Sequence, residues 1–145
     1  MQIGWFHKGK GSVSDACTAP KMNRPVPGGR ILIFDDDPTY GEALGAVLRS
    51  AGFEVAVSAH FHPALELLGG DQPLDLLLAD IVVPEGVNGM ALSRMARMRR
   101  RDLKIIYITG YDLPGAEQEA LGPILRKPIA DDVLLSEVRR VLGVN

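Results

Sequence analysis

Short apolar runs alternate with amphipathic stretches from Arg30 to the end of the chain. The runs have the length of strands, and the stretches between them carry apolar residues at helical spacing. The expected strands span residues 30–34, 53–57, 74–79, 103–108 and 123–126. The expected helices span about 38–52, 62–68, 89–100, 114–121 and 131–142. Five strand–helix units in succession predict an α/β fold, in which helices cover both faces of a parallel sheet.

The 145 residues leave room for one domain, which we place at 30–145. Residues 1–29 show neither strand nor helix periodicity, and we expect them to form a flexible extension. The single cysteine, Cys17, excludes an internal disulfide. No run approaches the roughly 18 apolar residues of a membrane span, and no secretory signal opens the chain. With a net charge of −2, we expect a cytoplasmic protein that binds neither membranes nor nucleic acid directly.

Four of the expected strands end at residues that suit phosphoryl chemistry. These residues are Asp35-Asp36-Asp37, Asp80, Thr109 and Lys127. The carboxyl ends of parallel strands meet at one edge of a sheet, which is where ligands bind in such folds. We therefore expect the acids, the hydroxyl and the ammonium to line one crevice. Clustered carboxylates are costly without a cation, and Mg²⁺ is usually held by one or two carboxylates with waters and phosphate oxygens.

The same residues predict a phosphoryl-transfer site. Asp80 would bind Mg²⁺ together with Asp35 and Asp36, and its carboxylate is a competent nucleophile that would form an acyl phosphate. Phosphoryl transfer needs mainly positioning and charge neutralisation. Lys127 would therefore pair with one phosphoryl oxygen, and Thr109 would donate a hydrogen bond to another.

The pattern resembles the receiver domains of two-component response regulators over about residues 30–145. The matching residues are Asp35-Asp36, Asp80, Pro84, Gly89, Thr109 and Lys127-Pro128. This resemblance implies a flavodoxin-like, doubly wound (βα)5 fold whose five-stranded parallel sheet has the order 2-1-3-4-5. It also implies that the Lys127-Pro128 peptide bond is cis, as is typical in the family.

The resemblance further implies a role for each site residue. The residue that matches Asp80 accepts a phosphoryl group from a kinase histidine. The pair that matches Asp35 and Asp36 holds Mg²⁺, with Asp36 the more direct ligand and Asp35 acting more through water. The carbonyl of Val82, two residues after the acceptor, is also a ligand in the family.

Three departures from the family pattern concern the route from the phosphoryl group to the output. The loop from Asp80 to Gly89 is longer than the commonest form and resembles the loop of receivers attached to hybrid kinases. The segment between Thr109 and Lys127 is short, so we expect a shortened or irregular helix there. Ile124 stands where the family often has a switching aromatic residue, which puts the usual switch in doubt.

These features predict a stand-alone receiver that takes a phosphoryl group onto Asp80 with Mg²⁺. The expected partners are a histidine kinase or a histidine phosphotransfer protein, and an unknown downstream protein, because no output domain follows Asn145 in this sequence. The protein would promote its own phosphorylation, and could promote its own dephosphorylation, without turning over a diffusible substrate.

Two other functions fit part of the pattern. An apolar strand followed by Asp-Asp-Asp-Pro-Thr also resembles the first motif of haloacid-dehalogenase-type phosphatases, with Asp35 as nucleophile and Asp37 as general acid/base. That placement leaves Asp80 without a role, and the acids Asp131 and Asp132 follow the lysine too closely to supply the last motif. A binding module that keeps the fold without phosphorylation is the second alternative, and it gives no reason for the full set of site residues.

Several other residues are expected to have structural roles. Asp37 should cap the helix that begins at Pro38, and Asp131 and Asp132 should cap the last helix. The arginines within 94–101 should form a solvated helix end. Three methionines should pack on a helix face: Met90, Met95 and Met98. The apolar positions of the first helix lie on one face: Tyr40, Leu44, Val47 and Leu48. The apolar set of the last helix is Val133, Leu134, Val138, Val141 and Leu142.

Overall fold

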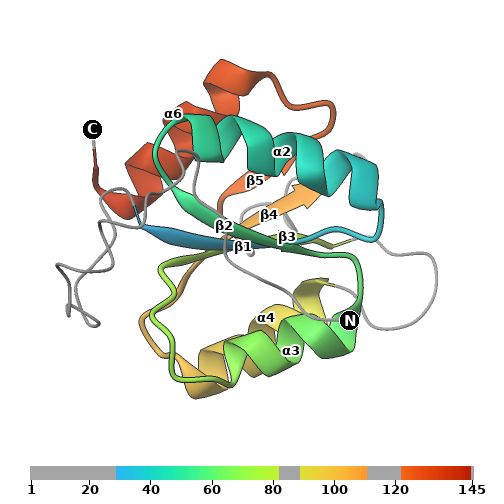
Figure 1. Cartoon of the computed structure of the whole chain (residues 1–145), viewed down its shortest axis with the longest axis vertical. Coiled ribbons are helices and arrows are strands. Elements are labelled where there is room, and N and C mark those ends of the chain that lie inside the picture. The colour runs from blue at the N-terminus through green and yellow to red at the C-terminus, as the bar shows by residue number, and fades with distance from the viewer. Residues whose placement is uncertain (1–28, 82–88, 111–121, 145) are drawn as a thin grey trace, which may run out of the picture.

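A five-stranded parallel sheet in the order β2-β1-β3-β4-β5 forms the centre of the molecule (Figure 1). The structure is a computed structural model and describes residues 29–81, 89–110 and 122–144. The strands are β1 (Arg30–Phe34), β2 (Glu54–Ser58), β3 (Leu76–Asp80), β4 (Lys104–Thr109) and β5 (Ile124–Arg126). The predicted fold class and strand order are therefore confirmed.

Helices cover both faces of this sheet. In the described parts of the chain, α2 (Pro38–Ser50) and α6 (Asp131–Leu142) lie on one face, whereas α3 (Phe61–Leu68) and α4 (Gly89–Arg99) lie on the other (Figure 1). None of these helices has the length and apolar character needed to cross a membrane. The helix expected at 114–121, and most of the loop expected after β3, fall outside the described residues.

Burial on both faces explains why the strands read as continuous apolar runs. Side chains alternate between the two faces of a strand. In β1, Ile31 and Ile33 belong to the core layer beneath α2 and α6, whereas Leu32 and Phe34 belong to the layer beneath α3 and α4. All four are buried. A sheet with two buried faces leaves polar side chains room only at its edges and strand ends.

Helix α2 begins and packs as the sequence predicts. The Asp37 side chain caps it by accepting hydrogen bonds from the backbone N–H groups of Thr39 and Tyr40, at 3.0 and 3.3 Å. Pro38 occupies the first turn, where no intrahelical N–H bond is lost. The helix buries Leu44 and Leu48, with Tyr40 and Val47 partly buried beside them.

Helix α6 differs from the prediction in two respects. Its N-cap residue is Ala130, which supplies no side-chain hydrogen bond. Asp131 and Asp132 occupy the first turn instead, where a carboxylate favours the positive helix end without capping it. Val133 is 48% exposed because the buried stripe runs through Leu134 and Val138, one turn apart.

Helix α4 buries one leucine and three small residues rather than Met95 and Met98. Its buried positions are Gly89, Leu92, Ser93 and Ala96. Met98 is 82% exposed and Met95 is 36% exposed, so the prediction that both pack on a helix face was wrong. Leu92 and three small residues fill the buried face, and Met95 and Met98 lie outside this stripe.

The arginine run at the end of α4 is only partly solvated. Arg100 donates hydrogen bonds from Nε to the Leu68 carbonyl and from Nη2 to the Gly70 carbonyl, both at 2.8 Å. Arg97 donates from Nε to the Leu103 carbonyl at 3.0 Å. Helix ends leave carbonyls without intrahelical partners, so Arg100 satisfies groups at the end of α3 and joins the two helices.

Candidate functional site

The carboxyl edge of the sheet brings the predicted site residues together. Asp35 follows β1 directly, and Asp80 is the last residue of β3. Thr109 is the last residue of β4 and pairs in register with Arg126, the residue before Lys127. Parallel pairing therefore places an acid from each of two neighbouring strands, a hydroxyl and a lysine at one end of the sheet.

Three of these side chains are buried in spite of their polarity. The exposed fractions are 0% for Asp35, 3% for Asp80 and 1% for Thr109. Asp36 is exposed. Burying a carboxylate is costly unless it is paired or hydrogen-bonded, so partners must be built into this edge.

Lys127 is the charged partner of both buried acids. Its Nζ donates a hydrogen bond to Asp80 Oδ2 at 3.2 Å and lies 2.8 Å from Asp35 Oδ2. Burial alone would lower the pKa of Lys127, but attraction to Asp35, and then to Asp80, outweighs burial and raises the pKa above its ordinary value. The lysine is therefore an ammonium at neutral pH.

The arrangement of carboxylate oxygens fits a divalent cation. Asp35 Oδ1 accepts the Asp37 N–H at 2.9 Å. Asp35 Oδ2 is buried and has no aligned hydrogen-bond donor among the described residues, so its contact with the ammonium is an ion pair only. Asp35, Asp36 and Asp80 each offer an oxygen, and these oxygens lie within 4.8 Å of one another. Mg²⁺ selects oxygen donors of this kind.

Gly89 shapes the backbone beside Asp80. It is the first residue of α4, and a Cβ atom there would overlap the Asp80 carbonyl oxygen and lie 2.9 Å from Ala79 Cβ. Only glycine permits this approach of α4 to the end of β3. The predicted metal ligand Val82 lies outside the described residues. The Lys127-Pro128 bond is cis, as the sequence resemblance implied.

Tyr40 is a neighbour of the site that sequence reasoning assigned only to the core. Its ring centroid lies 4.7 Å from Lys127 Nζ, and its hydroxyl oxygen accepts the Ile129 N–H at 3.0 Å. A tyrosine has an apolar ring and a polar tip, which suits a half-buried position beside a charge. Tyr40 lies in the first turn of α2, where helical periodicity indicates a position facing the core but not the charge beside it.

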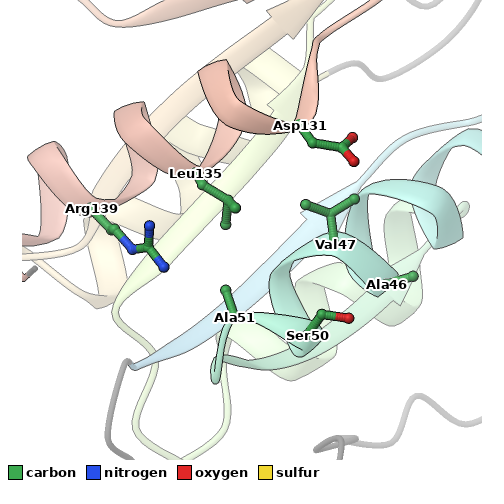
Figure 2. A pocket seen from close by; sticks show the side chains of 7 residues that line it. All are labelled: Ala46, Val47, Ser50, Ala51, Asp131, Leu135 and Arg139. Atoms are coloured by element: carbon green, nitrogen blue, oxygen red, sulfur yellow. The ribbon is translucent and has the colours of Figure 1, made fainter.

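A groove between α2 and α6 lies apart from the site (Figure 2). Its volume is about 520 Å³, and none of the carboxylates at the strand ends lines it; among the described residues its one acidic lining residue is Asp131, the first residue of α6. Val47 and Leu135 face each other across it, with Arg139 toward the far end (Figure 2). The groove is thus a feature of the helix layer and not of the reaction site.

The family comparison agrees with this architecture. The family model described as the response regulator receiver domain matches residues 31–139. The chain belongs to the response regulator receiver family, whose members act in two-component signalling. The family match starts one residue into β1 and ends within α6, so it includes the sheet and the helices on both of its faces.

Individual relatives span very different lengths. The C4-dicarboxylate transport transcriptional regulatory protein DctD of Pseudomonas aeruginosa is 37% identical over 79% of this chain but only 25% of its own length. The response regulator receiver protein CpdR of Brucella abortus is 34% identical over 78% of this chain and 96% of its own length. The chain therefore spans a quarter of one relative and nearly all of the other.

Solved receiver structures share the fold. The CheY-like response regulator receiver domain protein from Methanospirillum hungatei superposes with a TM-score of 0.71 at 28% identity, covering 79% of this chain and 94% of that one. The chemotaxis protein CheY4 of Vibrio cholerae gives a TM-score of 0.70 at 26% identity, covering 79% and 98%.

Proposed function

We propose that this chain is a Mg²⁺-dependent phosphoacceptor that takes a phosphoryl group onto Asp80 from a phosphohistidine of a kinase or a phosphotransfer protein. One observation carries the proposal: the Lys127 ammonium contacts two buried carboxylates, at 2.8 Å from Asp35 and 3.2 Å from Asp80. A cation shared between acids at the carboxyl edge of a parallel sheet is suited to receive an anionic group there.

We assign the role of nucleophile to Asp80 and the role of holding charges to Asp35. Asp35 Oδ1 is held by the Asp37 N–H, and Asp35 is fully buried, so it is suited to hold charges in place. In the proposed step an Asp80 carboxylate oxygen attacks the phosphorus of the phosphohistidine. The new P–O bond forms as the P–N bond breaks, and the imidazole leaves with the electron pair and takes up a proton.

The other site residues neutralise and orient the transferred group. Lys127 would exchange its contact with Asp80 for one phosphoryl oxygen while it keeps its ion pair with Asp35. The Thr109 hydroxyl would donate a hydrogen bond to a second phosphoryl oxygen. The proposed Mg²⁺ ligands are Asp35, Asp36, Asp80 and the Val82 carbonyl. Mg²⁺ supplies positive charge that neutralises the phosphoryl oxygens.

The signal is proposed to pass to a separate downstream protein, by partner binding or by onward phosphotransfer, in the cytoplasm. The match to CpdR covers 96% of that relative, which is named a response regulator receiver protein, and this likeness supports signalling through a separate partner. The domain proposed for residues 30–145 would carry the phosphoacceptor activity, with 1–29 as an extension of it.

Mapping of the acyl phosphate tests the proposal. The protein is incubated with Mg²⁺ and acetyl phosphate, and with phosphoramidate in a second series, and the labelled residue is located by mass spectrometry after borohydride reduction. We expect label on Asp80 that disappears in Asp80→Asn. Asp102→Asn is the matched control, because Asp102 is an exposed aspartate just before β4, at the amino end of the sheet.

The other possible results each contradict the proposal in a different way. Label on Asp35 would support the phosphatase-type reaction. A wild type that takes no label from either donor or from a cognate kinase would leave a receiver-like binding module. Label that persists in Asp80→Asn at the wild-type rate would show that another carboxylate is the acceptor.

A further inference from the structure

Tyr40 touches the lysine segment at two points. The ring centroid is 4.7 Å from Lys127 Nζ, a distance at which an ammonium is attracted to the face of an aromatic ring. The hydroxyl accepts the Ile129 backbone N–H at 3.0 Å, two residues farther along the chain. One side chain of α2 therefore contacts both the charge and the backbone of the connection between β5 and α6.

The contacts of Tyr40 complete a closed series of contacts that links Asp35, Asp37, Tyr40 and Lys127. Asp35 Oδ1 accepts the Asp37 N–H, and Asp37 Oδ1 accepts the Tyr40 N–H. The Tyr40 ring then faces Lys127 Nζ, and that ammonium lies 2.8 Å from Asp35 Oδ2. The first turn of α2 is thus fixed to the same acid that holds the lysine. A shift of the lysine would strain contacts on both sides of it.

A free lysine side chain is poorly suited to hold one place. Its ammonium is a point charge on a flexible four-carbon stem, and ordering that stem costs entropy. During transfer Lys127 must also leave Asp80 for a phosphoryl oxygen, so its contact with Asp80 cannot be what orders it. The other contacts of the ammonium in the structure are with Asp35 and the face of Tyr40, and neither would have to be given up.

We propose that Tyr40 is a positioning residue for phosphoryl transfer to Asp80: its ring and hydroxyl hold Lys127 and the segment after it in the geometry that receives the phosphoryl group. This inference rests on the proposed function and assigns a role to a residue outside the expected set of acids, hydroxyl and lysine. The side-chain contacts of Tyr40 described above are with Lys127 and Ile129, and neither of these is one of the buried acids.

Two substitutions separate the ring from the hydroxyl. Tyr40→Phe keeps the ring and removes the acceptor for the Ile129 N–H, and we expect labelling of Asp80 by acetyl phosphate to slow about threefold. Tyr40→Leu removes both contacts, and we expect a slowing of about tenfold. Tyr107→Phe is the matched control, because it removes a tyrosine hydroxyl that bonds Ser93 at 2.9 Å, away from the lysine. It should label at the wild-type rate.

A double-mutant cycle distinguishes positioning from general destabilisation. In a Lys127→Met background, Tyr40→Leu should slow labelling no further, because the group that it positions is gone. Exchange of the Ile129 amide hydrogen, measured by NMR, should be about fivefold faster in Tyr40→Phe. This second readout does not depend on phosphorylation, and Tyr40→Phe preserves the packing if Tyr40→Leu fails to fold.

The failures of the two proposals are distinguishable. A labelled wild type whose Tyr40→Leu and Tyr40→Phe variants label at the unchanged rate overturns the positioning role alone. Equal slowing by Tyr40→Leu with and without Lys127 also overturns it, because the effect would then not pass through the lysine. A wild type that takes no label overturns the proposed function and the positioning role with it.

Discussion

The Lys127 ammonium contacts two carboxylates, those of Asp35 and Asp80. Its Nζ is nearer to Asp35, at 2.8 Å, than to Asp80, at 3.2 Å, and Asp35 is also tied to the backbone through the Asp37 N–H. In the proposed reaction, the contact with Asp35 would keep the ammonium near Asp80 while the Asp80 carboxylate takes up the phosphoryl group.

Asp37 offers a test at the residue scale. Asp37→Ala removes the acceptor for the Thr39 and Tyr40 N–H groups, and we expect it to lower the free energy of unfolding by about 1 kcal/mol in urea titrations. Asp37→Asn keeps a capping oxygen, so its stability and its rate of Asp80 labelling should both stay close to wild type. If Asp37→Asn instead abolished turnover of a phosphorylated substrate, Asp37 would be a general acid/base, as in the phosphatase alternative.

The sequence predicted which residues gather at the site but not how they contact one another. Asp35, Asp80, Thr109 and Lys127 could be found because parallel strands must place their carboxyl ends at one edge. The contact between Tyr40 and Lys127 could not be predicted, since Tyr40 does not end a strand and its helical spacing indicates only a core position. Hydrophobic periodicity identifies the buried face of a helix, but it does not predict which charged residue that face contacts.

Among the elements, the strands were predicted better than the helix surfaces. A strand with two buried faces must be apolar throughout, so β1 and β3 stand out in the sequence. Most of the observed strands begin or end within a residue or two of the expected bounds, and β3 extends to include Asp80 itself. Hydrogen bonding to a neighbouring strand sets where each strand begins and ends, and this pairing cannot be predicted from the composition of the strand.

The errors on the helices have a common physical cause. In α4 the buried stripe consists of Leu92 and three small residues, and Met95 and Met98 lie outside it. In α6 the stripe is narrower than the apolar set, and Val133 falls outside it. The distance between a helix and its sheet decides which side chains fit between them. The hydropathy of the sequence contains no information about that distance.

Gly89 tests the close approach of α4 to β3. Gly89→Ala would place a Cβ atom against the Asp80 carbonyl oxygen and the Ala79 side chain, neither of which can move without shifting a central strand. We expect a loss of about 1–3 kcal/mol in the free energy of unfolding. The matched control is Gly70→Ala, whose Cβ would meet the Leu67 carbonyl oxygen at an ordinary 3.6 Å.

Chemical denaturation with urea measures both glycine variants under the same conditions. Because the Asp80 carbonyl would shift, Gly89→Ala should also slow Asp80 labelling, whereas Gly70→Ala should not. Equal stability of the two variants would contradict the steric argument, and it would mean that the backbone at the end of β3 can move freely.

At the scale of the whole molecule, the topology concentrates negative charge at one edge of the sheet. Asp35, Asp36 and Asp80 lie together there. Among the described residues, the Lys127 ammonium contacts two of them, Asp35 and Asp80. The strand order forces this clustering, because β1 and β3 are neighbours at the centre of the sheet (Figure 1). Like charges in one place oppose folding, so a bound cation should stabilise the fold as well as the reaction.

We therefore predict that Mg²⁺ binding raises the free energy of unfolding of the whole domain. A ligand that binds only the folded state adds about 1.4 kcal/mol to the free energy of unfolding for each tenfold rise in its concentration above Kd. We expect this slope for the wild type when urea titrations are repeated at increasing MgCl2. KCl at matched ionic strength should have a smaller effect, since it only screens the charges.

Asp36→Asn and Asp132→Asn form the matched pair for this measurement, because both replace exposed aspartates. Asp36 contributes an oxygen to the acidic cluster, and Asp132 lies in the first turn of α6. The Mg²⁺ slope should be strongly reduced in Asp36→Asn and unchanged in Asp132→Asn. The same slope in both variants would place the ion elsewhere on the protein and would remove the metal from the proposed site.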